Sequence, residues 1–157
     1  MADAATGTRG ASRSGKESTT VSKRGGEFRV VTSKSVLQII NELQRGLPYQ
    51  RLSKFEKESG LSLETIGQVI RVPKRTLARR KAAGRLPPDE SERVHRLSEL
   101  FAKAVHLFGG DAGRARRWLQ TPQRALGRAT PLEMASTEVG AREVENLIGR
   151  IEHGVFS

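Results

Sequence analysis

Basic side chains are concentrated in one short segment of this chain. Residues 71–85 contain seven Lys or Arg residues and no Asp or Glu, whereas residues 36–70 hold four of each sign and residues 86–157 hold ten of each. The net charge of +11 therefore comes from this segment and from residues 1–35, which hold seven basic and three acidic side chains. Such a concentration of positive charge indicates a polyanionic partner.

The spacing within this segment favours a DNA-reading helix. Arg75 and Arg79 are four residues apart, as are Thr76 and Arg80, so on a helix they form two adjacent exposed stripes. Lys74, Lys81 and Arg85 would flank a DNA groove and reach its phosphates. The predicted DNA-binding residues are therefore Lys74, Arg75, Thr76, Arg79, Arg80, Lys81 and Arg85.

The surrounding sequence has the layout of a helix-turn-helix between Leu61 and Gly84. An apolar-faced helix is followed by a break at Val72-Pro73 and then by the basic helix, whose Leu77 is expected to pack on the first helix. The major groove of B-DNA, about 12 Å wide, admits one such helix. Two positions depart from the usual pattern: Arg71 stands where glycine is common in the turn, and Arg80 where an apolar residue is common.

No grouping of residues predicts catalysis, a metal site or a cofactor. The three histidines, His95, His106 and His153, are isolated, and the chain has no cysteine. An enzyme acting on nucleic acid is therefore the weakest alternative. The absence of an apolar run of roughly 20 residues argues against a membrane span, and we expect a cytoplasmic protein.

Helical periodicity elsewhere predicts an all-α fold with a helix-turn-helix domain over residues 31–86 and a small helical domain over residues 87–157. Residues 1–30 are poor in apolar side chains and are predicted to be a disordered basic tail. Ser33 or Ser35 could cap a first helix that carries an apolar stripe of Val36, Leu37, Ile40 and Leu43.

The second half contains three further helical patterns. A long helix from Asp89 to Phe108 is too apolar for one small domain to bury alone, and helix-turn-helix proteins usually read a two-fold site, so we expect a homodimer. A short helix capped by Asp111 carries Trp118, which is expected to be a core residue. Thr130-Pro131-Leu132-Glu133 has the spacing of a capping box and begins a final helix. That helix carries Val139, Val144, Leu147, Ile148 and Ile151.

The chain resembles the Xre/MbcA/ParS family of antitoxins over roughly its last 80 residues, and more weakly back to about Leu47. The resemblance rests on pieces that occur in a fixed order: Arg75-Thr76-Leu77-Ala78-Arg79-Arg80-Lys81, Gly84-Arg85-Leu86, Glu90-Ser91-Glu92-Arg93, Phe108-Gly109-Gly110, Ala115-Arg116-Arg117-Trp118-Leu119, Thr121-Pro122, Thr130-Pro131-Leu132-Glu133 and Gly149-Arg150-Ile151-Glu152-His153-Gly154-Val155-Phe156. One stretch, Leu126-Gly127-Arg128-Ala129, departs from the paired glycines usual in the family.

The resemblance implies a type II antitoxin that binds and inhibits a RES-domain toxin, an enzyme that consumes NAD, and represses its own operon at operator DNA. It also implies that the C-terminal end lies at the entrance of the toxin's active site. The predicted toxin-binding residues are Glu152, His153, Gly154, Val155, Phe156 and Ser157. The last 27 residues carry five acids against two arginines, a charge that should suit a cleft built for phosphates. The alternative is a stand-alone repressor whose C-terminal helices only dimerise it, and an adjacent toxin gene would distinguish the two.

Overall fold

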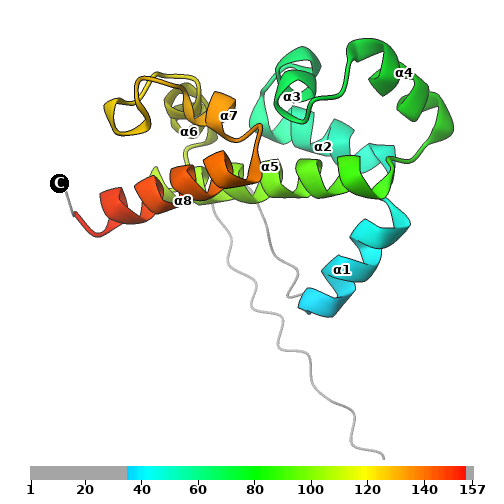
Figure 1. Cartoon of the computed structure of the whole chain (residues 1–157), viewed down its shortest axis with the longest axis horizontal. Helices are drawn as coiled ribbons and strands as arrows, with labels where there is room; N and C mark the ends of the chain where they lie inside the picture. Colours follow the sequence, from blue (N-terminus) through cyan, green and yellow to red (C-terminus); the bar gives the residue numbers. More distant parts are fainter. Residues whose placement is uncertain (1–34, 155–157) are drawn as a thin grey trace, which may run out of the picture.

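A computed structural model of the protein describes residues 35–154, and all the regular secondary structure in that part is helical (Figure 1). The helices are α1 (Val36–Arg45), α2 (Tyr49–Ser59), α3 (Leu63–Val69), α4 (Lys74–Ala83), α5 (Pro88–Leu107), α6 (Ala112–Leu119), α7 (Pro131–Met134) and α8 (Glu138–Glu152), with a 3₁₀ turn η1 (Arg124–Leu126). The predicted all-α class is confirmed. The predicted disordered tail and residues 155–157 lie outside the described residues.

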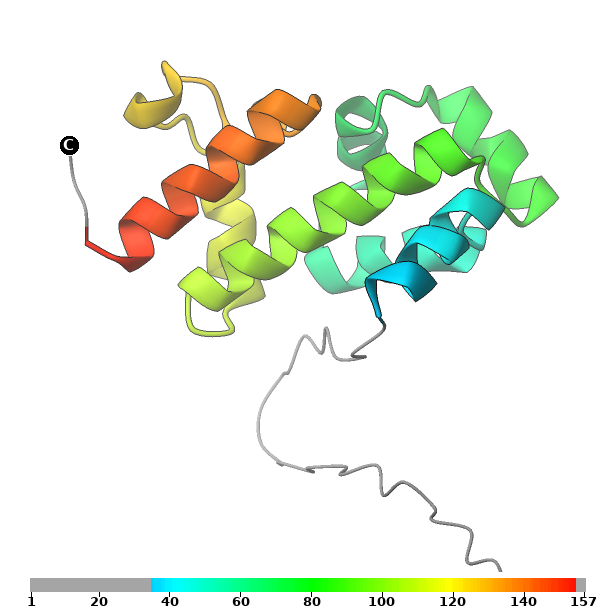
Figure 2. The ribbon, with the colours of Figure 1, turned by 60° about the horizontal axis from the view of Figure 1, so that its bottom comes forward.

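Helix α5 is the axis on which the other helices pack. It has 20 residues, about 30 Å of helix, and contacts α1, α2, α6 and α8. Helices α1–α4 gather around one half of it, and α6–α8 around the other (Figures 1 and 2). Most of its apolar side chains are buried within one chain, namely Val94, Leu97, Leu100, Phe101, Ala104 and Val105, and Ala102 and Leu107 are half-buried. The expectation that this helix is too apolar for one chain to bury is therefore wrong, because α5 leaves no large apolar face for a partner. The homodimer itself stays a prediction.

Aromatic contacts tie α5 to its neighbours. Phe55 of α2 meets Phe101 edge-on, with ring centroids 5.8 Å apart. After the end of α5, the Phe108 and Trp118 rings lie 6.1 Å apart, and the Arg114 guanidinium stands over Phe108. The expected core role of Trp118 is confirmed, since this half-buried side chain packs against the main core.

Several helix starts follow the predicted caps. Ser35 caps α1 and Ser62 caps α3, where the Thr65 amide donates to the Ser62 hydroxyl at 3.1 Å. Asp111 caps α6, and its carboxylate accepts from the Arg114 amide at 2.8 Å. The capping box at Thr130 is also present. Local sequence chemistry therefore sets where these helices begin.

The predicted final helix is in fact two helices, α7 and α8. Thr137 caps α8, and its hydroxyl accepts from the Gly140 amide at 3.0 Å. A Cβ at position 140 would lie 2.0 Å from the Met134 carbonyl oxygen, so only glycine lets α8 pass this close to the end of α7. Val139 was expected on the inner face but is 77% exposed, because it lies on the opposite side of α8 from Ile148.

The predicted division of the chain after residue 86 remains a prediction about folding units. Helix α5 begins near that point and continues through both groups of helices, so its two ends pack against different helices. Among residues 35–154 no helix is long and apolar enough to cross a membrane.

Candidate nucleic-acid interface and C-terminal surface

The turn between α3 and α4 depends on two backbone features. Arg71 has a φ of 57°, the left-handed conformation in which glycine is common, so the turn keeps its geometry without the glycine. Gly67 of α3 lies where a Cβ would be 2.9 Å from the Val72 carbonyl oxygen and 3.1 Å from a Leu77 methyl carbon. The missing side chain therefore lets α4 approach α3 closely.

Leu77 fixes the orientation of α4. Its side chain is 1% exposed and belongs to the same core as Ile66, Ile70 and Val72, as the sequence predicted. With Leu77 inward, the opposite side of α4 faces solvent.

The exposed side of α4 carries basic side chains with small residues between them. Lys74, Arg75, Arg79 and Lys81 are exposed, and Thr76 is half-buried. Ala78 and Ala82 are also exposed and separate the long basic side chains. Small residues at these positions would let the helix backbone come close to the floor of a DNA groove, and a methyl group can contact thymine. The charge pattern alone does not point to these two alanines.

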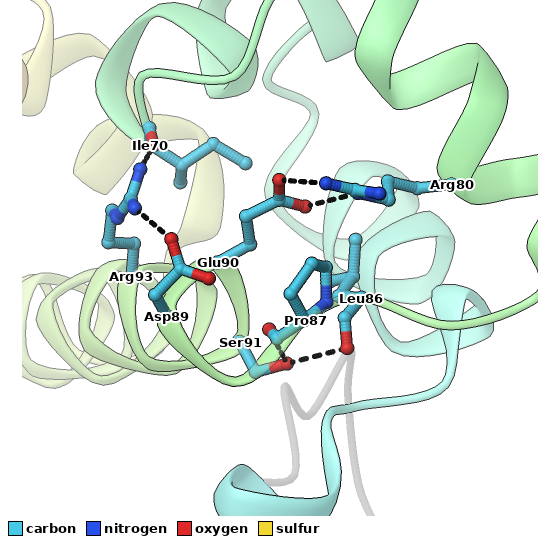
Figure 3. Close-up of polar contacts among 8 residues, drawn as sticks. All are labelled: Ile70, Arg80, Leu86, Pro87, Asp89, Glu90, Ser91 and Arg93. Carbon is cyan, nitrogen blue, oxygen red and sulfur yellow. Dashed lines mark hydrogen bonds and ion pairs between the residues drawn. The ribbon is translucent and has the colours of Figure 1, made fainter.

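Arg80 is held within the protein by Glu90. The guanidinium donates from Nε and Nη2 to the two carboxylate oxygens of Glu90, at 3.0 and 2.9 Å (Figure 3). The Glu90 side chain is 8% exposed and that of Arg80 is 25% exposed. The hydrogen bonds that Arg80 donates to Glu90 raise the pKa of Arg80, so this guanidinium stays charged. Arg80 thus fills a position where an apolar residue is common, and a buried carboxylate compensates its charge.

The first turns of α5 contact three other parts of the helix-turn-helix. Besides the Glu90–Arg80 pair, Arg93 donates to the Ile70 carbonyl at the end of α3, at 2.9 Å, and pairs with Asp89 (Figure 3). The Ser91 hydroxyl accepts from the Leu47 amide at 2.8 Å, in the link between α1 and α2. These contacts fix α3 and α4 relative to α5.

Arg85, the last of the predicted DNA-binding residues, also has partners within the chain. Its guanidinium donates to the carbonyl oxygens of Arg45 and Gly46, at 3.0 and 2.6 Å. Of the seven predicted residues, the structure thus engages Arg80 and Arg85 internally. It leaves the side chains of Lys74, Arg75, Arg79 and Lys81 without a hydrogen bond or ion pair among residues 35–154.

The predicted toxin-binding residues begin at the exposed end of α8. Glu152, His153 and Gly154 are exposed, and Gly154 has a left-handed φ of 66° that ends the helix. Val155, Phe156 and Ser157 lie outside the described residues. No ion pair engages Glu152 within residues 35–154.

A groove of about 570 Å³ runs between α5 and α8 and leads to this end. Its lining includes Glu99, Lys103, His106, Glu145 and Glu152, and the Lys103 ammonium lies 3.0 Å from the Glu145 carboxylate. Among the described residues, no cluster of His, Asp or Glu has the arrangement of a metal site. The groove therefore offers a mixed, mainly acidic surface next to the C-terminal end.

Family models match both parts of the chain. The Xre-like helix-turn-helix domain of antitoxins matches residues 38–99, and the antitoxin Xre/MbcA/ParS C-terminal toxin-binding domain matches residues 103–154. An antitoxin Xre from Yersinia enterocolitica is 38% identical over 120 residues, which cover 76% of this chain and 81% of that protein. The chain belongs to the Xre family of antitoxins.

A second antitoxin Xre, from Photorhabdus laumondii, is 40% identical over 116 residues, covering 73% of this chain and 78% of the relative. Among solved structures, a chain of the M. tuberculosis MbcT–MbcA toxin–antitoxin complex has the same fold as this Xre protein. The TM-score is 0.54 and the identity 22%, over 69% of this chain and 96% of that one. The resemblance stated from the sequence is confirmed.

The loop that departs from the family's paired glycines keeps the backbone that glycines would adopt. Gly127 and Arg128 have φ values of 64° and 71°, both left-handed. Like Arg71, Arg128 is a non-glycine residue in a conformation that favours glycine.

Proposed function

We propose that this Xre protein is the antitoxin of a type II module, acting in the cytoplasm, that inhibits a RES-domain toxin and represses its own operon as a homodimer bound to operator DNA. The observation that carries the proposal is the separation of two surfaces. The exposed basic side of α4 lies at one end of α5, and the C-terminal end of α8 lies at the other (Figures 1 and 2). One chain could therefore bind DNA and a toxin at the same time.

For DNA, we assign base contacts to Arg75 and Arg79 and phosphate contacts to Lys74 and Lys81, with Thr76 beside them. Arg75 and Arg79 project from the side of α4 opposite the buried Leu77, and Lys74 and Lys81 are exposed at its flanks. We assign Arg80 and Arg85 to positioning α4, because their hydrogen bonds are made within the chain.

For the toxin, we assign binding to the end of α8 and the residues that follow, from Glu152 to Ser157. The choice of a RES-domain toxin rests on the family resemblance and on charge. Glu138 and Glu145 are paired with Arg142 and Lys103, whereas Glu152 is exposed and has no ion-pair partner within residues 35–154. A carboxylate in this position is complementary to a cleft that binds the phosphates of a dinucleotide.

Two measurements on the full chain test the proposal. Co-expression with the product of the neighbouring gene, followed by a pull-down, should recover a stable complex in which NAD consumption by the toxin is suppressed. Binding to the module's own promoter DNA should fall steeply with salt, since phosphate contacts release counterions. A chain that binds the promoter but no neighbouring product would be a stand-alone repressor. If the chain inhibits the toxin but does not bind the promoter, only the proposed repression of its own operon is wrong.

A further inference from the structure

The second half of the chain has an uneven distribution of charge. Residues 86–157 hold ten basic and ten acidic side chains, but residues 112–129 hold five arginines and no Asp, Glu or Lys. The rest of this half therefore has ten acidic side chains against five basic ones. Positive charge is concentrated in α6 and in the loop that follows it, outside the basic segment that we assign to DNA.

Two of the five arginines contact neighbouring parts of the chain, and three do not. Arg114 stands over the Phe108 ring, and the Arg116 guanidinium lies against Gly60 at the end of α2. The side chains of the other three are exposed and have no hydrogen bond or ion pair among residues 35–154, namely Arg117, Arg124 and Arg128. These three side chains are therefore available to a partner.

The loop of residues 123–129, which carries two of these three arginines, is closed and anchored. The Gln123 amide donates to the Ala129 carbonyl oxygen at 3.0 Å, and the Arg128 amide donates to the Gln123 carbonyl oxygen at 2.9 Å. Leu126, between the two arginines, is 8% exposed and belongs to the main core, and η1 contacts α8. A loop fixed in this way loses little conformational entropy when it binds a partner. We call it the arginine loop.

Arg128 occupies a backbone conformation that is unfavourable for arginine. Its φ is 71°, in the left-handed region where a Cβ is disfavoured and glycine is preferred. A glycine could make the same backbone hydrogen bond to Gln123, so the geometry of the loop does not require this side chain. An arginine kept in a strained conformation on an exposed, anchored loop points to a contact with another molecule.

The composition and the position of the arginine loop favour an acidic protein surface as its partner. A guanidinium pairs with a carboxylate through two parallel hydrogen bonds, and arginine is enriched at protein interfaces, where lysine is depleted. The loop has arginine without lysine, whereas residues 71–85 have both. In both views the loop lies at the same end of α5 as the C-terminal end of α8, and α4 lies at the other end (Figures 1 and 2). A toxin bound at the end of α8 is thus the partner that would lie next to the loop.

We propose that the arginine loop is a second contact with the toxin, in which Arg124 and Arg128 pair with carboxylates on an acidic part of the toxin surface. The inference rests on the proposed toxin binding and adds a site to it, because that binding is assigned above to residues 152–157 alone. An acidic helix end and a basic loop beside it would also fix the orientation of the toxin, since opposite charges must meet at both sites.

The substitution R128G separates a binding role from a structural one. It removes the guanidinium and relieves the left-handed conformation, so the full chain should melt no lower than wild type. Affinity for the purified product of the neighbouring toxin gene should fall about tenfold, and its salt dependence should weaken. R71G is the matched control, because Arg71 is the other non-glycine residue with a left-handed φ within residues 35–154, and it should keep wild-type toxin affinity. An R128G variant that binds the toxin like wild type, or that melts several degrees lower, would overturn the proposal.

Charge reversal tests the chemistry of the partner. R124E/R128E should weaken toxin binding more than R124A/R128A does, because two glutamates would then face carboxylates. Equal losses in the two variants would show that the facing surface is not acidic, and the proposal would be wrong. If R124A/R128A lowers promoter binding and leaves toxin binding unchanged, DNA is the partner and the proposal is equally wrong.

The same titrations distinguish this inference from the proposed function on which it rests. A wild-type chain that binds no toxin would contradict both. Wild-type toxin binding that R124A/R128A leaves unchanged would contradict the arginine loop alone.

Discussion

At the scale of single residues, Gly67 sets how closely the two helices of the DNA-binding motif can pack. A Cβ at this position would lie 2.9 Å from the Val72 carbonyl oxygen, which cannot rotate away as a flexible side chain would. Any larger residue must push α4 or its preceding turn outward. The position is therefore structural, and its effect reaches the DNA surface through α4.

We expect Gly67→Ala to lower the free energy of unfolding by about 1–2 kcal/mol, since overpacking outweighs the gain in helix propensity. Operator affinity should fall as well, because α4 shifts. Gly149→Ala on α8 is the matched control, as a Cβ at position 149 would have nothing within 4 Å. That variant should gain roughly 0.5–1 kcal/mol by denaturant unfolding. Equal effects of the two substitutions would refute the close-contact explanation.

The ion pair between Arg80 and Glu90 is the second feature at the scale of single residues. A charge as buried as that of Glu90 is costly without its partner, while replacing both partners by apolar residues is often neutral. Arg80 also stands where an apolar residue is common in this motif. Single and double substitutions can therefore distinguish the structural contribution of this pair from a contribution of Arg80 to DNA binding.

We expect Arg80→Ala to lower the melting temperature by several degrees, because it leaves the Glu90 carboxylate buried and unpaired. The double variant R80L/E90L should melt near wild type and keep operator affinity within a few-fold. Asp89→Ala, at the more exposed Arg93 pair, is the control and should change little. If R80L/E90L folds normally but loses operator binding by more than tenfold, Arg80 contacts DNA, and our structural assignment fails.

At the scale of elements, α4 and α5 have different roles in the helix-turn-helix. Helix α4 supplies the exposed basic side chains, and the first turns of α5 hold α3, α4 and the α1–α2 link through Glu90, Arg93 and Ser91. Changes confined to the outer side of α4 should therefore affect recognition without affecting the fold.

Replacing both Arg75 and Arg79 by Ala should weaken operator binding by about 1–3 kcal/mol for each lost bidentate base contact. Far-ultraviolet circular dichroism, melting and toxin binding should match wild type, since both side chains are exposed. Replacing Arg117 and Arg124, exposed on the other half, removes the same charge and should cost little in a titration at physiological salt. Wild-type affinity in the α4 variant would show that another surface reads DNA.

At the scale of the whole molecule, α5 connects the two surfaces to which we assign DNA binding and toxin binding. The family's helix-turn-helix model ends at residue 99 and its toxin-binding model begins at residue 103, so both adjoin within α5. The residues around Phe101, fully buried in the middle of α5, join the two halves into one core. Changes at either end should then act independently of each other.

Deleting residues 154–157 should weaken toxin binding by one to two orders of magnitude, because Phe156 burial in a partner is worth about 1.5–3 kcal/mol. Operator binding and melting temperature should stay close to wild type, since the α4 surface lies at the other end of α5. The Arg75/Arg79 variant is the reciprocal control and should retain toxin neutralisation. A large drop in melting temperature would make these residues part of the core, and full neutralisation would move toxin binding to the surface between Thr130 and Ile151.

The amino-acid sequence alone determined the helices, most of their caps and the basic side of α4. These features depend on neighbours three or four residues apart, as with Ser62 and Thr65 or Arg75 and Arg79, so local periodicity predicts them. The tertiary structure decided which basic residues remain free. Arg80 is engaged because Glu90, on another helix, is buried beside it. Such pairings, and the exposure of apolar residues such as Val36 and Leu37 on α1, depend on how distant helices pack. No local sequence pattern predicts that packing.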